Sequence, residues 1–428
     1  MKTLIRQGHL LDALAGKDGI YDILIEDGVV KEVAENISTD VENIIDAAGC
    51  YVMPGFIDLH VHLREPGFEY KETVATGTMA AARGGYTSVC PMPNTMPVMD
   101  SPDKVRNFLE ICDRDAVVHV LPVGAVTVGQ AGKELADIAG MKEAGIVAVS
   151  EDGKSVMDTR VYRDGMRLAA EVSVPVFAHC EDKVLVGNGA LNAGAKAEEL
   201  QVEGISNAVE DIIVARDILL AKETGAKLHL CHCSTSDSAV LTKMAKEQGL
   251  PVTAEVCPHH FTMSDDEIPG DDANYKMNPP LRSRADVEAL KQALADGVMD
   301  AISTDHAPHS AEEKARPIAQ APFGIVGSET AFALAVTELV KPGILTKVQL
   351  QEKMSANPAA IAGIDKGTLS PGHSADVVIV DFDAEYTIDA SKFASRGKNT
   401  PFHGKKVWGR VLKTLVDGNV VYDYEQEK

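Results

Sequence analysis

The sequence DLHVH, from Asp58 to His62, places two histidines two residues apart near the end of an apolar run. Because side chains alternate between the faces of a strand, Asp58, His60 and His62 are expected to share one face. Neutral imidazole is the commonest metal ligand, and this spacing brings two ring nitrogens close to one point. The pair therefore predicts a metal-chelating site, whereas the isolated His119 and His229 are interpreted as hydrogen-bonded core residues.

Four more polar residues follow other apolar runs of the chain: Asp152, His179, His232 and Asp305. If those runs are parallel strands of one barrel, their carboxyl ends converge on the face where active sites form. Together with His60 and His62, the set contains more ligands than one zinc ion needs. It suits two metal ions that share a carboxylate and a water molecule.

Eight short apolar runs between about residues 54 and 367 predict the strands that position these side chains. They are GFIDLHVHL, TSVCPM, VVHVLPVGAV, IVAVSED, VPVFAHC, AKLHLCHC, PVTAEVC and DAISTDH. The segments between them repeat apolar residues at helical spacing, as in AVEDIIVARDILLAKETG, and often end in glycine. Strands that alternate with helices form parallel sheets, so eight such units predict an α/β fold with a closed (β/α)8 barrel of the TIM type.

Both chain ends have a different pattern, with β-branched alternation and Asp-Gly turns that are typical of hairpins. Neither end could bury much surface alone, so we expect the two to pair into one small β-sandwich domain. The predicted organisation is 1–53 for the N-terminal part of the small β domain, 54–367 for the metal-dependent catalytic barrel, and 368–428 for the C-terminal part of the β domain.

The composition limits what the protein can bind. Its 41 Lys and Arg against 64 Asp and Glu give a formal net charge of −23, which repels phosphate backbones and anionic membranes. We therefore expect neither nucleic acid nor a membrane as a partner. Seven cysteines indicate reduced thiols, and no secretory signal or bilayer-spanning run is recognised. These features predict a cytoplasmic protein.

The cysteines allow a second zinc hypothesis. Cys231, Cys233 and Cys257 could form a structural site with His259 and His260. No regular Cys-x-x-Cys spacing is present, and small buried cysteines are ordinary in protein cores. We therefore assign these cysteines to the core.

The motifs taken together resemble the amidohydrolase superfamily, and within it the long-chain bacterial dihydroorotases. They are PGFIDLHVHLREPG, PMPNTMP, SEDGKSV, FAHCED, LHLCHCST, EVCPHHF, YKMNPPLR, STDHAPH and FGIVGSET, from residue 54 to about 330. The tail GHSADVVIVDFD is similar to the closing sheet segment of the superfamily. The resemblance implies reversible cyclisation of N-carbamoyl-L-aspartate to dihydroorotate, a hydrolase-type step of pyrimidine biosynthesis.

The resemblance also implies a binuclear centre with two Zn²⁺ ions per subunit. His60, His62 and Asp305 would hold one ion, His179 and His232 the other, and Asp152 would bridge the two. Many relatives bridge their metals with a carboxylated lysine, but here Lys154 lies two residues beyond the strand end that presents Asp152.

This centre accounts for hydrolysis of a cyclic amide. Two zinc ions lower the pKa of a bridging water towards about 7, which supplies hydroxide at neutral pH to attack the carbonyl. Asp305 can take the hydroxide proton and pass it to the leaving ring nitrogen, so it is expected to act as both general base and general acid. An amide nitrogen leaves poorly unless it is protonated.

Arg64 follows the two histidines at the expected rim of the barrel. Its planar fork could bind the substrate carboxylate in a bidentate manner, although a surface salt bridge with Glu65 is the plain alternative. The substrate-binding set implied by the resemblance is His62, Arg64, Asn94, Asn278 and His309, with the backbone of Phe323 and Gly324. Asn94 and His309 are similar to carboxylate contacts of the family, and Asn278, Phe323 and Gly324 to contacts of the ring amides.

Other readings stay open on the sequence alone. The segment 306–324 is either a mobile lid over the site or a static surface loop. A hydantoinase or allantoinase would share the barrel, metals and reaction type. A catalytically silent, dihydroorotase-like structural partner should lack metal ligands, and none is missing here. The resemblance suggests a homodimer, and association with other pyrimidine-pathway enzymes is left open.

Overall fold

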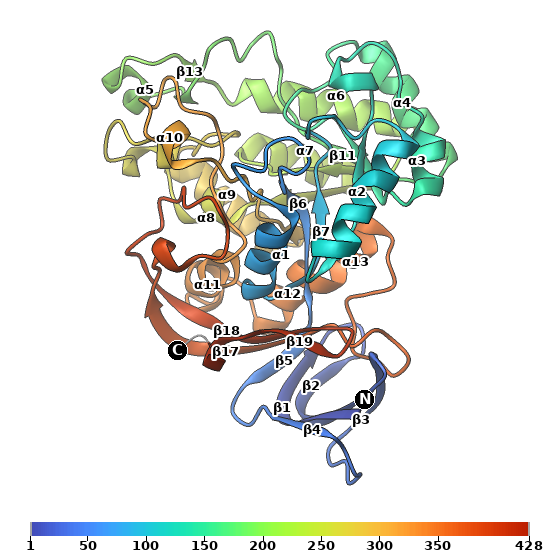
Figure 1. The fold of residues 1–428 in the computed structure, drawn as a ribbon. Coiled ribbons are helices and arrows are strands. Elements are labelled where there is room, and N and C mark those ends of the chain that lie inside the picture. Colours follow the sequence, from blue (N-terminus) through green and yellow to red (C-terminus); the bar gives the residue numbers. More distant parts are fainter. Residues whose placement is uncertain (1, 427–428) are drawn as a thin grey trace.

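The computed structural model describes residues 2–426, and its larger part is a barrel of parallel strands (Figure 1). The barrel strands are β6 (Phe56–Val61), β7 (Tyr86–Pro91), β8 (His119–Val120), β9 (Val123–Ala125), β10 (Ala148–Ser150), β11 (Val176–Ala178), β14 (Leu228–Leu230), β15 (Val252–Val256) and β16 (Ala301–Ile302). Each of the eight predicted runs overlaps a barrel strand, and the third run is divided into β8 and β9. A parallel bridge between Val61 and His306 joins the first strand to the segment that follows the last.

Helices cover the outside of these strands (Figure 1). They are α1 (Val74–Arg83), α2 (Pro102–Asp115), α3 (Ile138–Ala144), α4 (Thr159–Glu171), α6 (Ala208–Thr224), α7 (Ser236–Glu247), α9 (Arg284–Ala295), α11 (Ala331–Ala335), α12 (Lys347–Gln351) and α13 (Asn357–Ala362). Their ends follow local chemistry: the Asp158 carboxylate accepts backbone N–H bonds at the start of α4, and Gly225 ends α6 in the left-handed conformation. The helix expected over 208–225 is therefore confirmed.

Shorter elements lie mainly in the loops at the carboxyl ends of the strands. They are β12 (Leu191–Asn192), β13 (Gly204–Ile205), α5 (Ala195–Glu199), α8 (Pro258–Thr262) and α10 (Ala311–Lys314). Within residues 2–426, no helix is both long and apolar enough to cross a membrane.

The two ends of the chain form one eight-stranded sheet beside the barrel, where blue and red strands lie together in Figure 1. Its members are β1 (Lys2–Asp12), β2 (Lys17–Glu26), β3 (Val29–Ala34), β4 (Asn43–Asp46), β5 (Tyr51–Pro54), β17 (Val377–Thr387), β18 (Lys406–Val416) and β19 (Asn419–Asp423). The ends are joined where β17 runs antiparallel to β5. A bridge from Val29 to Ser374 folds the sheet over a core of its own that includes Ile23 and Val377.

Two hairpins of this sheet turn at the predicted Asp-Gly pairs. Asp27 and Gly28 have φ values of 51° and 81°, and Asp417 and Gly418 have values of 46° and 72°. Positive φ at both central residues matches the right-handed twist of the flanking strands, and Asp-Gly tolerates it. All seven cysteines are free, in agreement with the reduced thiols expected from their number and scatter along the chain.

Candidate metal centre and active site

The six predicted metal ligands are buried and converge at the carboxyl ends of the barrel strands. His60 Nε2 lies 3.3 Å from Asp152 Oδ1, and His62 Nε2 lies 3.1 Å from Asp305 Oδ1. On the other side of Asp152, its Oδ1 is 3.4 Å from His179 Nδ1 and 3.9 Å from His232 Nε2. Asp152 therefore lies between two pairs of histidines.

The ring nitrogens of this cluster are arranged to bind a cation and not to hydrogen-bond with one another. Both ring nitrogens of His60 are buried and make no hydrogen bond to a described residue. His179 Nδ1 and His232 Nε2 face each other at 2.9 Å. Donor atoms of His60, His62 and Asp305 lie within 4.8 Å of one another, as do those of His60, Asp152 and His232. Buried polar atoms are normally hydrogen-bonded, so this geometry fits residues that hold metal.

The two aspartates of the cluster are held in the charged form. Burial alone would raise the pKa of Asp152, but the neighbouring His60, His179 and His232 hold this pKa well below its ordinary value. Burial opposes ionisation of Asp305 too, and its hydrogen bond with His62 and the charge of His60 lower its pKa. Both carboxylates can therefore serve as anionic ligands.

The ring nitrogens on the far side of the cluster meet further polar groups. Glu255 Oε1 lies 3.4 Å from His60 Nδ1, and Glu181 Oε2 lies 3.0 Å from His179 Nε2. Such partners fix the tautomer and orientation of ligating imidazoles. Neither glutamate was predicted from the sequence. Glu255 carries a recognisable signal, because it is a charged residue within the apolar run PVTAEVC.

Asn94 orients His62 in the way that the two glutamates orient His60 and His179. Its Oδ1 lies 3.0 Å from His62 Nδ1, which donates to it if Nε2 is the ligand atom, and its Nδ2 donates to Asp152 Oδ2 at 2.9 Å. Asn94, which is predicted to bind the substrate carboxylate, therefore hydrogen-bonds with two of the candidate metal ligands.

Asp58 shares the strand of His60 but does not join the cluster. Its carboxylate accepts hydrogen bonds from the backbone and hydroxyl of Thr304 at 3.0 and 2.6 Å, and from His60 N at 3.2 Å. Burial raises the pKa of Asp58 to about 7, although these bonds oppose the shift. Asp58 therefore fastens the first strand to the residue that precedes Asp305.

Two candidate ligands are presented by turns and not by strand alternation. The strand β14 ends at Leu230, two residues before His232, and β16 ends at Ile302, before Asp305. His232 and Asp305 have φ values of 37° and 47°, which non-glycine residues seldom adopt. Strand parity therefore does not explain their direction. Backbone strain of this kind concentrates at functional sites.

Arg64 turns inward at the rim of the barrel. Its Nε donates to Pro308 O at 3.2 Å, and its guanidinium lies 3.4 Å from His309 Nε2. The nearby carboxylate of Glu65 instead accepts the backbone N–H of Val74 at 2.9 Å. The alternative salt bridge between Arg64 and Glu65 is thus not formed in the described structure.

The remaining predicted substrate residues lie on loops that meet at this rim. His309 Nε2 lies 2.7 Å from Phe323 O, and Gly324 N donates to Lys276 O at 3.0 Å, which places the loop of Asn278 beside residues 323–324. Gly324 has a φ of 128°, and a Cβ there would lie 2.7 Å from that of Ala307. Only glycine allows this close approach.

Two residues that the sequence analysis missed fasten segment 306–324. The buried ammonium group of Lys314 donates to the carbonyls of Lys276, Pro322 and Gly324 at 3.2, 3.1 and 2.8 Å. The side chain of Asn399 accepts from His309 N and donates to the carbonyls of Ala307 and Gly324. The loop is therefore bound to the barrel and to the C-terminal segment.

The alternative cysteine-rich zinc site is not assembled as one group. Cys257, His259 and His260 lie within 4.8 Å of one another, whereas Cys231 lies beside His60 and Glu255. His229 is a satisfied core residue, with ring nitrogens 2.8 Å from Thr253 Oγ1 and 2.9 Å from Glu255 Oε2.

Comparison with known proteins places this geometry in a family. A model described as Dihydro-orotase-like matches residues 49–238, and a model of the Amidohydrolase family matches residues 232–422. Dihydroorotases of Pelotomaculum thermopropionicum and Ligilactobacillus salivarius are each 48% identical to the chain, over 98% and 100% of both lengths respectively. Among solved structures, the L-hydantoinase (dihydropyrimidinase) of Arthrobacter aurescens is 26% identical, with a TM-score of 0.88 over 98% of this chain and 96% of that chain.

The barrel and its histidine–aspartate cluster define an amidohydrolase. Within that class, the chain belongs to the dihydroorotase family. The fold class and the family that the motifs indicate are thereby confirmed. The hydantoinase shares the barrel with far fewer identical residues than the dihydroorotases do, which disfavours the hydantoinase reading of the sequence.

Proposed function

We propose that the protein is a dihydroorotase, which interconverts N-carbamoyl-L-aspartate and dihydroorotate. The observation that carries the proposal is the position of Arg64. Its guanidinium lies at the rim beside His309, next to the buried cluster that contains Asp305. A planar fork in this place can bind the carboxylate that dihydroorotate carries and that hydantoin lacks.

We assign two zinc ions to the cluster. His60, His62 and Asp305 would hold one ion, and His179 and His232 the other, with Asp152 shared. The donor set of imidazole and carboxylate suits zinc. The ring nitrogens of His60 make no hydrogen bond to a described residue, although carboxylates lie 3.3 and 3.4 Å away, and this supports a metal at this point. When bound, the cations supply Lewis-acid activation of water and of the substrate carbonyl at neutral pH.

The residues of the chain then position the substrate and move protons. Arg64, Asn94 and His309 would bind the substrate carboxylate, while Asn278 and the backbone of residues 323–324 would bind the ring amides. His62, whose ring lies beside Asn94, would also contact the substrate. The carboxylate of Asp305 would accept a proton from the attacking water and deliver it to the ring nitrogen, so that the nitrogen leaves as a neutral amide. In the direction of ring closure, the same transfer runs in reverse.

The setting of this reaction is also proposed. A cytoplasmic location agrees with the seven free cysteines. A homodimer is suggested by the family resemblance, and association with other enzymes of pyrimidine biosynthesis would place the substrate close to its source. Sedimentation of the purified chain tests the dimer.

A spectrophotometric assay tests the function. The zinc-loaded protein is supplied with dihydroorotate, hydantoin or allantoin, before and after treatment with a chelator. We expect turnover of dihydroorotate alone, lost on chelation and restored by zinc. Turnover of only the other rings would contradict the roles of Arg64, Asn94 and His309. Inactivity towards all three rings would favour a silent structural partner.

A further inference from the structure

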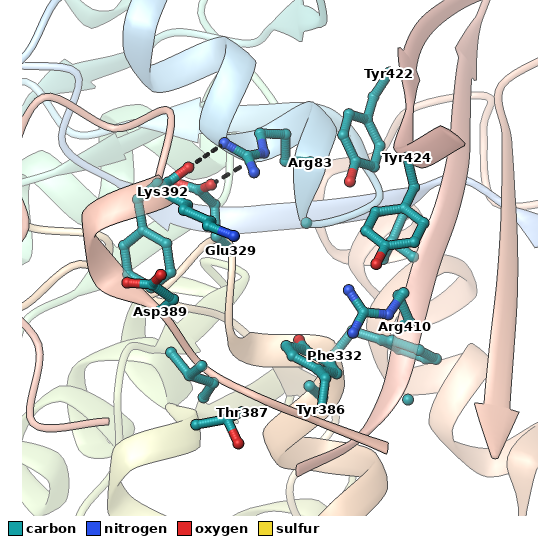
Figure 2. Close-up of a pocket in the computed structure, with 16 residues that line it drawn as sticks. Arg83, Glu329, Phe332, Tyr386, Thr387, Asp389, Lys392, Arg410, Tyr422 and Tyr424 are labelled. Atoms are coloured by element: carbon teal, nitrogen blue, oxygen red, sulfur yellow. Dashed lines mark hydrogen bonds and ion pairs between the residues drawn. The ribbon is translucent and has the colours of Figure 1, made fainter. Parts of the chain in front are cut away.

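A cavity lies between the barrel and the terminal sheet, away from the candidate metal centre (Figure 2). Its volume is about 430 Å³, within the range of about 300–1,000 Å³ typical of small-molecule sites. Residues of α1, α11, β17, β18 and β19 line it. It adjoins Arg83 and Gly84, which precede the amino end of β7, so it opens at the end of the barrel opposite the cluster.

The cavity contains an arginine, Arg410, whose guanidinium group is positioned to bind an anion. The guanidinium carbon of Arg410 lies 4.0 Å from the ring centroid of Tyr386 and 4.4 Å from that of Tyr424, between the two rings (Figure 2). Among residues 2–426, no carboxylate forms an ion pair with Arg410 and no group accepts a hydrogen bond from it. Stacking fixes the plane of the fork and leaves its N–H groups available.

The acidic groups of the cavity already have hydrogen-bond or ion-pair partners. The Glu329 carboxylate pairs with Arg83 Nε at 3.3 Å and accepts backbone N–H bonds from Ala394 and Ser395 at 3.0 and 3.1 Å. Asp389 accepts bonds from the backbone and hydroxyl of Ser391 at 3.1 and 2.6 Å.

Lys392 adds a second cation. Its side chain extends into the cavity, and its ammonium group has no ion-pair partner in the described part of the chain (Figure 2). Neither Arg410 nor Lys392 forms an ion pair with a described residue, in a protein whose net charge of −23 repels anions overall, so a pair of cations at one place is needed to hold an anion there. Their placement favours a ligand with a phosphate or carboxylate group.

The walls favour a ligand that also contains a flat ring. Aromatic residues make up only 5% of the chain, yet five of them line this cavity: Phe332, Tyr386, Phe393, Tyr422 and Tyr424. Aromatic faces bind planar rings by stacking. Arginine and lysine bind the anionic group at the same time.

We infer that this cavity is a binding site for an aromatic anion, a planar ring that carries a phosphate or a carboxylate. Arg410 and Lys392 bind the anionic group, and the tyrosines bind the ring. The site is distinct from the candidate active site, and the inference does not depend on the reaction catalysed there.

Isothermal titration of the full-length, zinc-loaded protein tests the inference. The probes are uridine 5′-monophosphate, benzoate, uridine and inorganic phosphate. We expect saturable binding of at least one of the first two, and binding at least tenfold weaker for uridine or phosphate, which each lack one half of the ligand. Preference for uridine 5′-monophosphate would identify a phosphate ligand, and preference for benzoate a carboxylate ligand. Equal binding of inorganic phosphate would overturn the role of the ring.

Variants locate the binding. Arg410→Gln and Lys392→Gln should each weaken it at least tenfold. Arg64→Met, at the rim of the candidate active site, and Lys406→Gln, an exposed lysine on the same strand as Arg410, should leave it unchanged. Lys392 is exposed, so its replacement tests the site even if Arg410→Gln fails to fold. Unchanged binding in Lys392→Gln, loss in Arg64→Met, or no saturable binding of any probe would refute the inference.

Discussion

The carboxylate of Glu255 lies 3.4 Å from Nδ1 of His60, on the side of the imidazole ring opposite the contact with Asp152. The glutamate is fully buried and also lies 2.9 Å from His229 Nε2. Burial would raise its pKa, but His229 and His60 together lower it. A charged carboxylate thus supports a candidate ligand from behind, as in the carboxylate–histidine–metal arrangements of many metalloenzymes.

Glu255→Gln should weaken metal retention about 10- to 100-fold, because His60 loses the anion that orients it and increases its basicity. The measurement is metal content after dialysis against graded concentrations of chelator. Glu143→Gln replaces an exposed glutamate and is the matched control. Equal retention by Glu255→Gln and the wild type would show that Glu255 does not support a ligand.

Asp305→Asn should lower kcat for dihydroorotate about 10²- to 10⁴-fold, because an amide cannot relay a proton. Its similar size should leave substrate binding largely intact. Turnover and equilibrium binding are both measured, together with metal content, because Asp305 is also a candidate ligand. Near-normal turnover with a full metal complement would remove Asp305 from the acid–base role.

Arg64→Met should reduce kcat/KM for dihydroorotate about 10- to 100-fold, because a charge-assisted pair with the substrate carboxylate contributes about 1.5–3 kcal/mol. Any weak binding of uncharged hydantoin should change little. Comparing the two ligands on the same variant provides an internal control. Equal losses would mean that Arg64 maintains the structure of the rim and does not recognise the carboxylate.

Asn399→Asp should raise KM for dihydroorotate several-fold, with a smaller effect on kcat. The change removes the amide donor that binds the carbonyls of Ala307 and Gly324, and it brings negative charge towards both oxygens. Segment 306–324, which carries His309, should then be held less firmly. Limited proteolysis within this segment gives a second measurement, and unchanged cleavage and KM would argue against the predicted role of Asn399.

Lys314 should make stability depend on pH. Burial, with a smaller contribution from Lys276, lowers the pKa of Lys314 from 10.5 to about 7. Between these two values the unfolded chain binds more protons than the folded chain, so stability linked to Lys314 increases as the pH rises from about 7 to about 10.5. Below about pH 7 both states hold the proton, so the contribution of Lys314 no longer changes with pH.

The difference in unfolding free energy between the wild type and Lys314→Met isolates this effect from other groups. We expect the difference to shift in favour of the wild type by up to about 1.4 kcal/mol for each pH unit in that window. Urea unfolding at pH 7, 8 and 9 provides the measurement. A difference that stays constant across the three values would show that Lys314 has an ordinary pKa.

The barrel and most of its candidate ligands could be predicted from local patterns. Each of the eight apolar runs overlaps a barrel strand, because burial on both faces of a parallel strand leaves a continuous apolar segment. The hairpins at Asp27-Gly28 and Asp417-Gly418 were equally readable, since few residue pairs tolerate two positive φ values. His60 and His62 were recognised by residue type and spacing within a single strand.

Contacts between distant segments could not be predicted in this way. Asn399 reaches His309 across 90 positions, and Asp58 reaches Thr304 across 246. The left-handed turns at His232 and Asp305 also leave no clear signal, because neither residue type demands a positive φ. These features depend on how the whole barrel closes.

Local sequence patterns were enough to predict the alternation of strands and helices, the pairing of the two chain ends in one sheet, and the types of residues available to bind metal and carboxylate. These properties are local, since burial periodicity and side-chain chemistry act over a few residues. Folding alone places Glu255 behind His60, lets Lys314 fasten segment 306–324, and stacks Arg410 in the cavity beside the terminal sheet. The physical reason is that packing brings together groups whose separation along the chain carries no information about their distance in space.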